Sequence, residues 1–154
     1  MQPAVTDSTP VKSSGRILFA LIAILSLAGV IVSAVSLQRH YAKSATAFCD
    51  FSQKFSCDIV NRSEQSSIIG IPVAGIGVAG YAALLVLATF SKSRPETSNR
   101  LLGAALVGLA FALYLTYVEA YELETWCILC LTSLALILLI SVAAVILKLR
   151  EARA

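Results

Sequence analysis

The sequence predicts an all-α integral membrane protein, built as a bundle of four transmembrane helices. Two observations carry this prediction. Of the 154 residues, 58% are hydrophobic and only 14% are charged, and the apolar residues gather in long blocks. Soluble domains contain about 45–50% apolar and about 25% charged residues. The composition therefore excludes a single water-facing domain.

The four apolar blocks cover residues 17–37, 68–90, 101–121 and 127–147. Each block has 21 to 23 residues, which as a helix gives a length of about 32–35 Å. This length spans a hydrocarbon core of about 30 Å with a modest tilt. A membrane β-strand needs only about 10 residues and alternates in polarity, which these blocks do not. Each block is therefore predicted to be a transmembrane helix.

The first block also has features of a cleavable signal peptide. Lys12 and Arg16 precede it, and Ala34–Ser36 offers small residues at which cleavage could occur. A signal core usually has about 7–15 apolar residues, whereas this block has 21. A retained helix is therefore the favoured interpretation.

The positive charges indicate the orientation of the helices. Eight of the 12 Lys and Arg residues lie in the N-terminal tail, the 91–100 loop and the C-terminal tail, and the other four lie in the 38–67 loop. Because Lys and Arg near helix ends mark the cytoplasmic side, both termini are expected to be cytoplasmic and the 38–67 loop to face outward. No basic cluster suggests binding to nucleic acid.

The chain is expected to form one membrane domain over residues 15–150. Residues 1–14 are rich in Ser, Thr and Pro and are predicted to be a disordered cytoplasmic tail. Residues 151–154 are predicted to be a second cytoplasmic tail.

All four cysteines fall on the predicted outer side. Cys49 and Cys57 lie in the outer loop, and Cys127 and Cys130 lie at the outer end of the fourth block. An oxidising compartment favours disulfides. A Cys-x-x-Cys motif in the first turn of a helix puts Cys127 near the positive end of the helix dipole, which lowers the pKa of its thiol and favours thiol–disulfide exchange. Two redox-active pairs are the favoured interpretation.

Other interpretations of the cysteines stay open. The two pairs could be structural disulfides in a non-enzymatic membrane assembly subunit. A zinc site is less favoured, because such sites usually combine two tight Cys-x-x-Cys pairs, and only one pair here is tight. A transporter is disfavoured, because the blocks contain no charge at their middle and no inverted repeat is evident.

Three polar residues outside the cysteines are further candidates for the site. Ser63 precedes Glu64 and would suit the N-cap of a helix. Glu119 lies in the third block near its outer end, where an ionisable group is costly. It suits either a proton relay or a carboxylate that reaches the membrane surface. Tyr114 suits either a cavity lining or an aromatic belt.

The ordered set of motifs resembles the vitamin K epoxide reductase family in its bacterial branch. The set comprises the Cys49 and Cys57 pair, CDIVNRS at 57–63, GIPVAGIGVAGY at 70–81 and YLTYVEAYELETWCILC at 114–130, and the resemblance extends over residues 15–147. The DsbB-like quinone-coupled oxidases also have four helices and two cysteine pairs, but with the tight pair in the first outer loop. This chain has the reverse order, which favours the epoxide reductase family.

The resemblance implies a helix bundle around a quinone, without a metal, to which electrons pass through both cysteine pairs. Cys127 and Cys130 resemble the active-site pair, with Cys130 facing the quinone. Cys49 and Cys57 resemble the loop pair that exchanges with a partner protein. Ser63 matches a serine or threonine that family members carry near the active site.

Two positions depart from the members that reduce vitamin K epoxide. Those members have an asparagine on the second helix and a tyrosine one turn past the Cys-x-x-Cys motif, and this chain has Val73 and Leu134 there. Neither side chain can hydrogen-bond an oxygen. Val73 and Leu134 are expected at the quinone site together with Tyr114 and Glu119, and quinone reduction is favoured over epoxide reduction.

The resemblance also implies a cellular setting. A thiol oxidase of this kind would stand in the bacterial inner membrane and pass electrons to ubiquinone or menaquinone, supporting disulfide bond formation. Its thiol substrate would be a periplasmic thioredoxin-like protein. Many bacterial relatives carry such a domain at their C-terminus, and because this sequence ends at Ala154, the partner is expected to be a separate protein.

Overall fold

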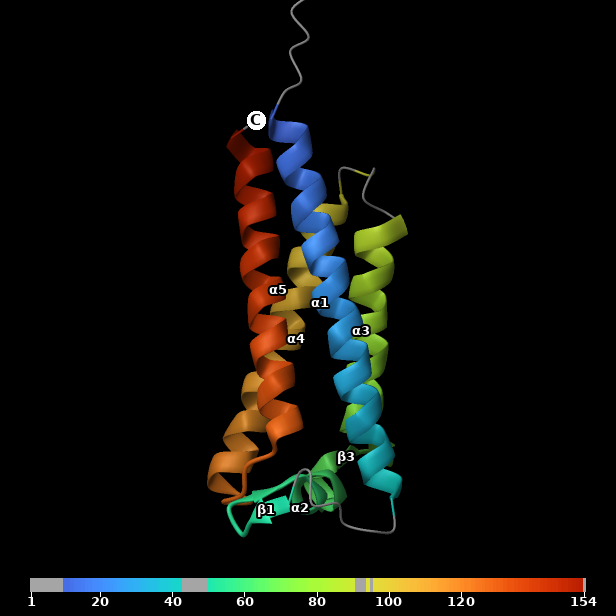
Figure 1. Ribbon diagram of the computed structural model, residues 1–154, viewed down its shortest axis with the longest axis vertical. Coiled ribbons are helices and arrows are strands. Elements are labelled where there is room, and N and C mark those ends of the chain that lie inside the picture. Colours follow the sequence, from blue (N-terminus) through green and yellow to red (C-terminus); the bar gives the residue numbers. More distant parts are fainter. Residues whose placement is uncertain (1–9, 43–49, 91–93, 95, 154) are drawn as a thin grey trace, which may run out of the picture.

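In the computed structural model, which describes residues 10–42, 50–90, 94 and 96–153, four long helices run side by side (Figure 1). They are α1 (Pro10–Tyr41), α3 (Val73–Phe90), α4 (Thr97–Tyr121) and α5 (Ile128–Arg153). Within the described residues, these four helices are long and apolar enough to cross a membrane. The predicted four-helix membrane bundle is confirmed.

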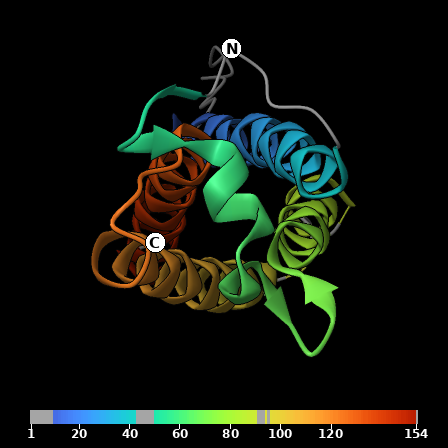
Figure 2. The same cartoon turned by 90° about the horizontal axis from the view of Figure 1, so that it is seen from below.

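Seen along its axis, the bundle is a ring (Figure 2). Helix α1 packs between α3 and α5, and α4 closes the ring by packing against both α3 and α5. One end of the ring carries the short helix α2 (Cys57–Arg62) and the connection from α4 to α5, and is called the cysteine end below. The other end, where α1 begins and α5 finishes, is called the packed end.

Short elements surround α2 at the cysteine end. The strands β1 (Asp50–Ser52) and β2 (Phe55–Ser56) pair antiparallel before α2, and the 3₁₀ helix η1 (Glu64–Ser66) follows it. A second antiparallel pair, β3 (Ser67–Ile68) and β4 (Ile71–Pro72), leads into α3. Figure 2 shows α2 crossing the end of the ring, so it covers the interior of the bundle.

The helix bounds differ most from the predicted ones at three places. Helix α3 begins at Val73, because residues 67–72 form the β3–β4 hairpin, whose turn puts Ile69 and Gly70 at positive φ angles of 55° and 78°. Helix α1 begins at Pro10, inside the stretch predicted to be disordered, and proline suits the first position of a helix. Helix α5 continues through the predicted tail as far as Arg153.

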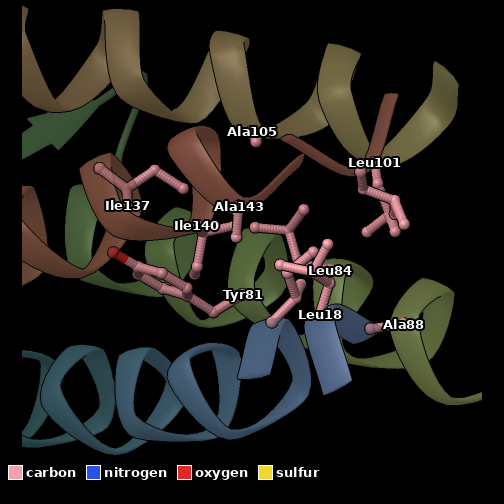
Figure 3. Packing of buried hydrophobic residues seen from close by; sticks show 11 residues of the cluster. Leu18, Tyr81, Leu84, Ala88, Leu101, Ala105, Ile137, Ile140 and Ala143 are labelled. Atoms are coloured by element: carbon pink, nitrogen blue, oxygen red, sulfur yellow. The ribbon is translucent and has the colours of Figure 1, made fainter. Parts of the chain in front are cut away.

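Aliphatic side chains fill the packed end. Leu18, Leu84, Leu101 and Ile140 come from α1, α3, α4 and α5 and belong to one buried cluster, and Figure 3 shows them lying among the four helices. At the boundary of this cluster, the ring of Tyr81 packs on α1 at Gly29, where an added Cβ would lie 2.3 Å from the ring. A glycine is therefore required at that position for α1 and α3 to approach each other.

A candidate redox site at the cysteine end

Backbone hydrogen bonds fix the loop before α2 onto the α4–α5 connection. The Trp126 N–H donates to the Lys54 carbonyl at 2.8 Å, and the Ser56 N–H donates to the Trp126 carbonyl at 3.2 Å. Cys57 follows Ser56, and Cys127 follows Trp126. The pairing therefore brings two cysteines together that are 70 positions apart in the sequence.

Helix α2 begins at Cys57 because Ser56 caps it. The Ser56 hydroxyl accepts a hydrogen bond from the Ile59 N–H at 3.3 Å, which satisfies a backbone donor in the first turn. The same hydroxyl donates to the Asp50 carboxylate. Sequence reasoning did not predict this six-residue helix, although a serine before the CDIVNR stretch is the signal that could have found it.

Ser63 ends α2 and does not cap a following helix through its side chain. Its hydroxyl donates back to the Val60 carbonyl at 2.8 Å, and η1 starts at Glu64 without a side-chain cap from Ser63. Ser63 therefore precedes η1 without a side-chain capping bond, because its hydroxyl is used in closing α2, and the second membrane helix begins only at Val73. Ser63 does line the cavity described below, beside the cysteine end.

Three described cysteines pack together where the N-terminus of α2 meets the start of α5. Cys57, Val60 and Cys127 form one buried cluster, and Cys130 packs against it. Cys57 and Cys127 are fully buried. Cys57 is disulfide-bonded, whereas Cys127 and Cys130 are free thiols. Cys49, the fourth predicted site residue, lies outside the described residues.

Asn61 joins the two sides of this cluster. Its side-chain amide donates to the Cys57 carbonyl at 2.9 Å and lies 3.9 Å from the sulfur of Cys127. Sequence reasoning missed Asn61, because its position depends on α2. In a helix, residues four apart share a face, so Asn61 lies on the face of α2 that carries Cys57.

Cys127 stands at the N-terminus of α5, as the motif predicted. Its carbonyl accepts from the Leu131 N–H at 3.0 Å. A hydrogen bond from the Cys130 thiol lowers the pKa of Cys127, and the backbone N–H groups of Cys130 and Leu129 lower it further. Burial and the charge of Glu119 oppose this shift without reversing it. Cys127 is therefore the more readily ionised partner for exchange with a disulfide.

Glu119 is turned inward and does not reach the membrane surface. Only 2% of the residue is exposed. The carboxylate oxygen Oε2 accepts from the Cys127 N–H at 3.1 Å, and the Glu119 carbonyl accepts from the Thr125 N–H at 3.2 Å. The interpretation as a surface-seeking carboxylate is wrong, because the chain folds back after α4 and covers it.

A cavity of about 550 Å³ lies inside the ring of helices, and α2 covers it at the cysteine end. Its wall is largely apolar, but its cysteine end is polar: His40, Asn61, Ser63, Glu119 and Cys130 all line it. Cys127 is not among the lining residues. Of the two free thiols, Cys130 is therefore the one that faces the cavity.

A pair of hydroxyl groups lies deeper in the cavity wall. The Tyr81 hydroxyl donates to the Ser133 carbonyl at 2.8 Å and lies 2.9 Å from the Ser133 hydroxyl. Both residues line the cavity, and Ser133 lies one turn along α5 from Cys130. The pair supplies polar atoms within an otherwise apolar part of the wall.

Small residues form part of the cavity wall on two neighbouring helices. Gly80 and Ala83 on α3, and Gly103 and Val107 on α4, line the cavity and are exposed. Gly80, Ala83 and Gly103 have little or no side chain, so they leave space in this part of the wall.

The other predicted quinone-site residues are divided by the structure. Val73 lines the cavity, whereas Leu134 and Tyr114 do not. Tyr114 is 57% exposed, because α4 faces the cavity with Phe111, Leu115 and Glu119, which repeat every four residues and turn Tyr114 outward.

His40, the single histidine of the chain, also lines the cavity. Its ring nitrogen Nδ1 lies 2.5 Å from the Asn61 carbonyl oxygen and 3.4 Å from the Ser66 hydroxyl. These contacts tie the end of α1 to α2 and η1. Among the described residues, no group of three or more His, Cys, Asp or Glu side chains could hold a metal ion.

One comparison with known proteins bears on this site. The family model described as the vitamin K epoxide reductase family matches residues 20–145. The matched segment includes most of the chain, most of each of the four long helices and all four cysteines.

Proposed function

Because the chain belongs to the vitamin K epoxide reductase family, it is a multi-pass membrane oxidoreductase, and we propose that it passes electrons from protein thiols to a membrane quinone. One observation supports this proposal most strongly. A disulfide-bonded Cys57 packs against Cys127, whose neighbour Cys130 faces a largely apolar cavity. The three sulfurs therefore form a path from the covering loop to the interior of the bundle.

Electrons enter through the loop pair, Cys49 and Cys57. Cys57 is fully buried, so an external thiolate attacks the Cys49 sulfur of their disulfide. The mixed disulfide is then resolved by the second thiol of the partner, which leaves Cys49 and Cys57 reduced and the partner oxidised. Such exchange requires a thiolate in contact with an accessible sulfur.

The electrons then pass to the second pair. After quinone reduction has joined Cys127 to Cys130, the Cys57 thiolate attacks the Cys127 sulfur and releases Cys130. Cys49 next attacks Cys57, which restores the loop disulfide and frees Cys127. The packing of Cys57 against Cys127 supports this route, because little motion is needed for the attack.

The quinone site is proposed to be the cavity beside Cys130. Quinone rings are apolar and carry lipid tails, and a passage beside the small lining residues Gly80 of α3 and Gly103 of α4 would let the tail remain in the bilayer while the ring lies near the thiol. Val73 supplies no hydrogen-bond donor in the wall, which favours a plain quinone as the acceptor over an epoxide.

The cysteine end is proposed to face the periplasm of a bacterium. The uneven distribution of Lys and Arg supports this orientation, with both termini on the cytoplasmic side. In this orientation a periplasmic thioredoxin-like protein would be the thiol substrate. Ubiquinone or menaquinone would accept the electrons, and the reaction would support disulfide formation in secreted proteins.

The proposal is tested with purified protein, a reduced thioredoxin-like protein and short-chain ubiquinone and menaquinone analogues. Quinone reduction is followed by absorbance. We expect Cys130→Ser to reduce turnover roughly 10³-fold or more, as for the loss of a reacting group, while Thr132→Ala, an exposed neighbour on the same helix, retains it. Equal turnover in wild type and Cys130→Ser would contradict the proposed path. Inactivity of the wild type with both quinones would instead favour an assembly subunit with structural disulfides.

A further inference from the structure

We propose that Glu119 is a catalytic residue that moves the proton of the reaction: it accepts the proton of the Cys130 thiol and donates it to a quinone oxygen. This inference rests on the proposed function, because it requires a quinone in the cavity. It adds a specific group for proton transfer, which the path through the cysteines does not supply.

The position of the carboxylate supports this role. Glu119 lies in the last turn of α4, is 2% exposed and lines the same cavity as Cys130. Its oxygen Oε2 accepts from the Cys127 N–H, which anchors the side chain at the base of the active-site pair. Among the described residues, the second oxygen, Oε1, is buried and has no hydrogen-bond partner.

A purely structural role would not require a carboxylate here. A glutamine could accept the hydrogen bond from the Cys127 N–H equally well, and it would bury no charge. A buried carboxylate oxygen without a partner is costly, and an ionisable group in a membrane span is usually retained for function. The unpartnered Oε1 is therefore available for a proton.

Few other groups near the thiols could take this proton. Beside Glu119, the Cys127 and Cys130 thiols are the reacting groups, and Cys57 of α2 is disulfide-bonded. Across the cavity, His40 of α1 contacts the Asn61 carbonyl, and Tyr81 of α3 donates to the Ser133 carbonyl. Among the described residues, Glu119 is the carboxylate that lines the cavity.

The proposed step balances in protons and electrons. The S–H bond of Cys130 breaks, its proton moves to Glu119, and the sulfur adds to a ring carbon of the quinone. The Cys127 thiolate then attacks the Cys130 sulfur, so the S–S bond forms and the C–S bond breaks. The electron pair stays on the quinone, one oxygen of which takes the proton from Glu119. The other takes a proton from solvent, which had received the Cys127 proton. Two thiols are oxidised and one quinone becomes a hydroquinone.

Glu119→Gln tests this role, because the glutamine keeps an acceptor for the Cys127 N–H and cannot transfer the proton. Each protein is first reduced with a small dithiol, freed of it, and mixed with a short-chain quinone in a single-turnover measurement across a range of pH. We expect Glu119→Gln to be about 10²-fold slower than wild type near neutral pH, the usual scale of general acid–base catalysis.

The difference in rate between Glu119→Gln and wild type should shrink as the pH rises, because solvent base then removes the Cys130 proton. The matched control Glu122→Gln removes the same charge from an exposed residue three positions further on and should match wild type.

A second measurement separates chemistry from misfolding. The rate at which the small dithiol reduces the oxidised protein should be similar in Glu119→Gln and wild type, because that step does not use the quinone. Equal quinone rates in Glu119→Gln and wild type, or a deficit that stays constant with pH, would overturn the role in proton transfer. If wild type itself fails to reduce the quinone, the proposed function fails and not this inference alone.

Discussion

The packed end of the bundle is filled by aliphatic side chains that meet from all four long helices, whereas the cysteine end encloses a cavity bounded by thiols, a carboxylate and hydroxyl groups. Leu101 and Ile140 at the packed end are fully buried by their neighbours. At the cysteine end, Glu119 Oε1 is buried without a partner among the described residues. The packed end is complete without a ligand, and the cysteine end is arranged to receive one.

Stability and chemistry therefore depend on different parts of one small bundle. The packed end holds the helices at a fixed spacing, so the ring stays open at its other end. Substitutions at the packed end should therefore change the free energy of unfolding with little effect on the thiols. Substitutions at the cysteine end should change the reactivity of the thiols with little effect on the free energy of unfolding.

The largest effect on stability is expected for Leu101→Ala. Removing a fully buried leucine should lower the free energy of unfolding by about 2–4 kcal/mol, because its neighbours cannot fill the space. The measurement is unfolding by a denaturing detergent, with Leu106→Ala as the control, since Leu106 is on the same helix and 47% exposed. Similar losses in the two variants would show that the packed end does not carry the stability. A loss of thiol exchange in folded Leu101→Ala would break the separation of the two ends.

A smaller effect, confined to the cysteine end, is expected for Cys130→Ala. The variant removes the thiol that lowers the pKa of Cys127, so the pKa of Cys127 should rise. The folded-state pKa is depressed in the native site, so the Cys127 thiolate forms at lower pH there than in the variant. Ultraviolet thiolate absorbance is followed against pH with Cys49 and Cys57 also replaced by alanine. Cys127 is then the last thiol of the variant, and an unchanged or lowered pKa would contradict the effect of the Cys130 hydrogen bond on Cys127.

The four spanning helices were predictable from the sequence, because they depend on a simple pattern. In a bilayer, a block of 21 to 23 apolar residues forms a spanning helix, because a helix satisfies all of its backbone hydrogen bonds internally. The order of the cysteines also identified the family. The exact helix bounds were less predictable, since the two-residue strands that precede α3 turn at Ile69 and Gly70 and carry little periodicity.

Much of the cysteine end could not be predicted, because it depends on contacts between distant segments. The pairing of Ser56 with Trp126 brings Cys57 to Cys127. No local sequence pattern in either segment predicts this pairing. The same holds for Asn61, whose role requires α2. Glu119 was flagged as costly in its span, but only the fold-back at Thr125 decides that it turns inward.

The smallest effect is expected at Tyr81, which lies on the boundary between the two ends. Its ring belongs to the aliphatic cluster (Figure 3), while its hydroxyl contacts Ser133 in the cavity wall. Tyr81→Phe keeps the ring in place against Gly29 and removes the hydroxyl. We expect a loss of about 1 kcal/mol in the free energy of unfolding, the usual contribution of one hydrogen bond.

A rise of about five-fold in the KM for quinone should accompany this loss if the hydroxyl pair also contacts the bound ring. Steady-state quinone reduction and detergent unfolding measure the two quantities in one set of variants. Tyr114→Phe is the matched control, because Tyr114 faces outward from α4 and should leave both unchanged. A change in KM without a change in stability would assign the Tyr81 hydroxyl to the ligand alone. A change in stability without a change in KM would show that Tyr81 serves packing alone. The packed end would then reach one helical turn closer to Cys130, and the quinone ring would have to lie nearer to α2.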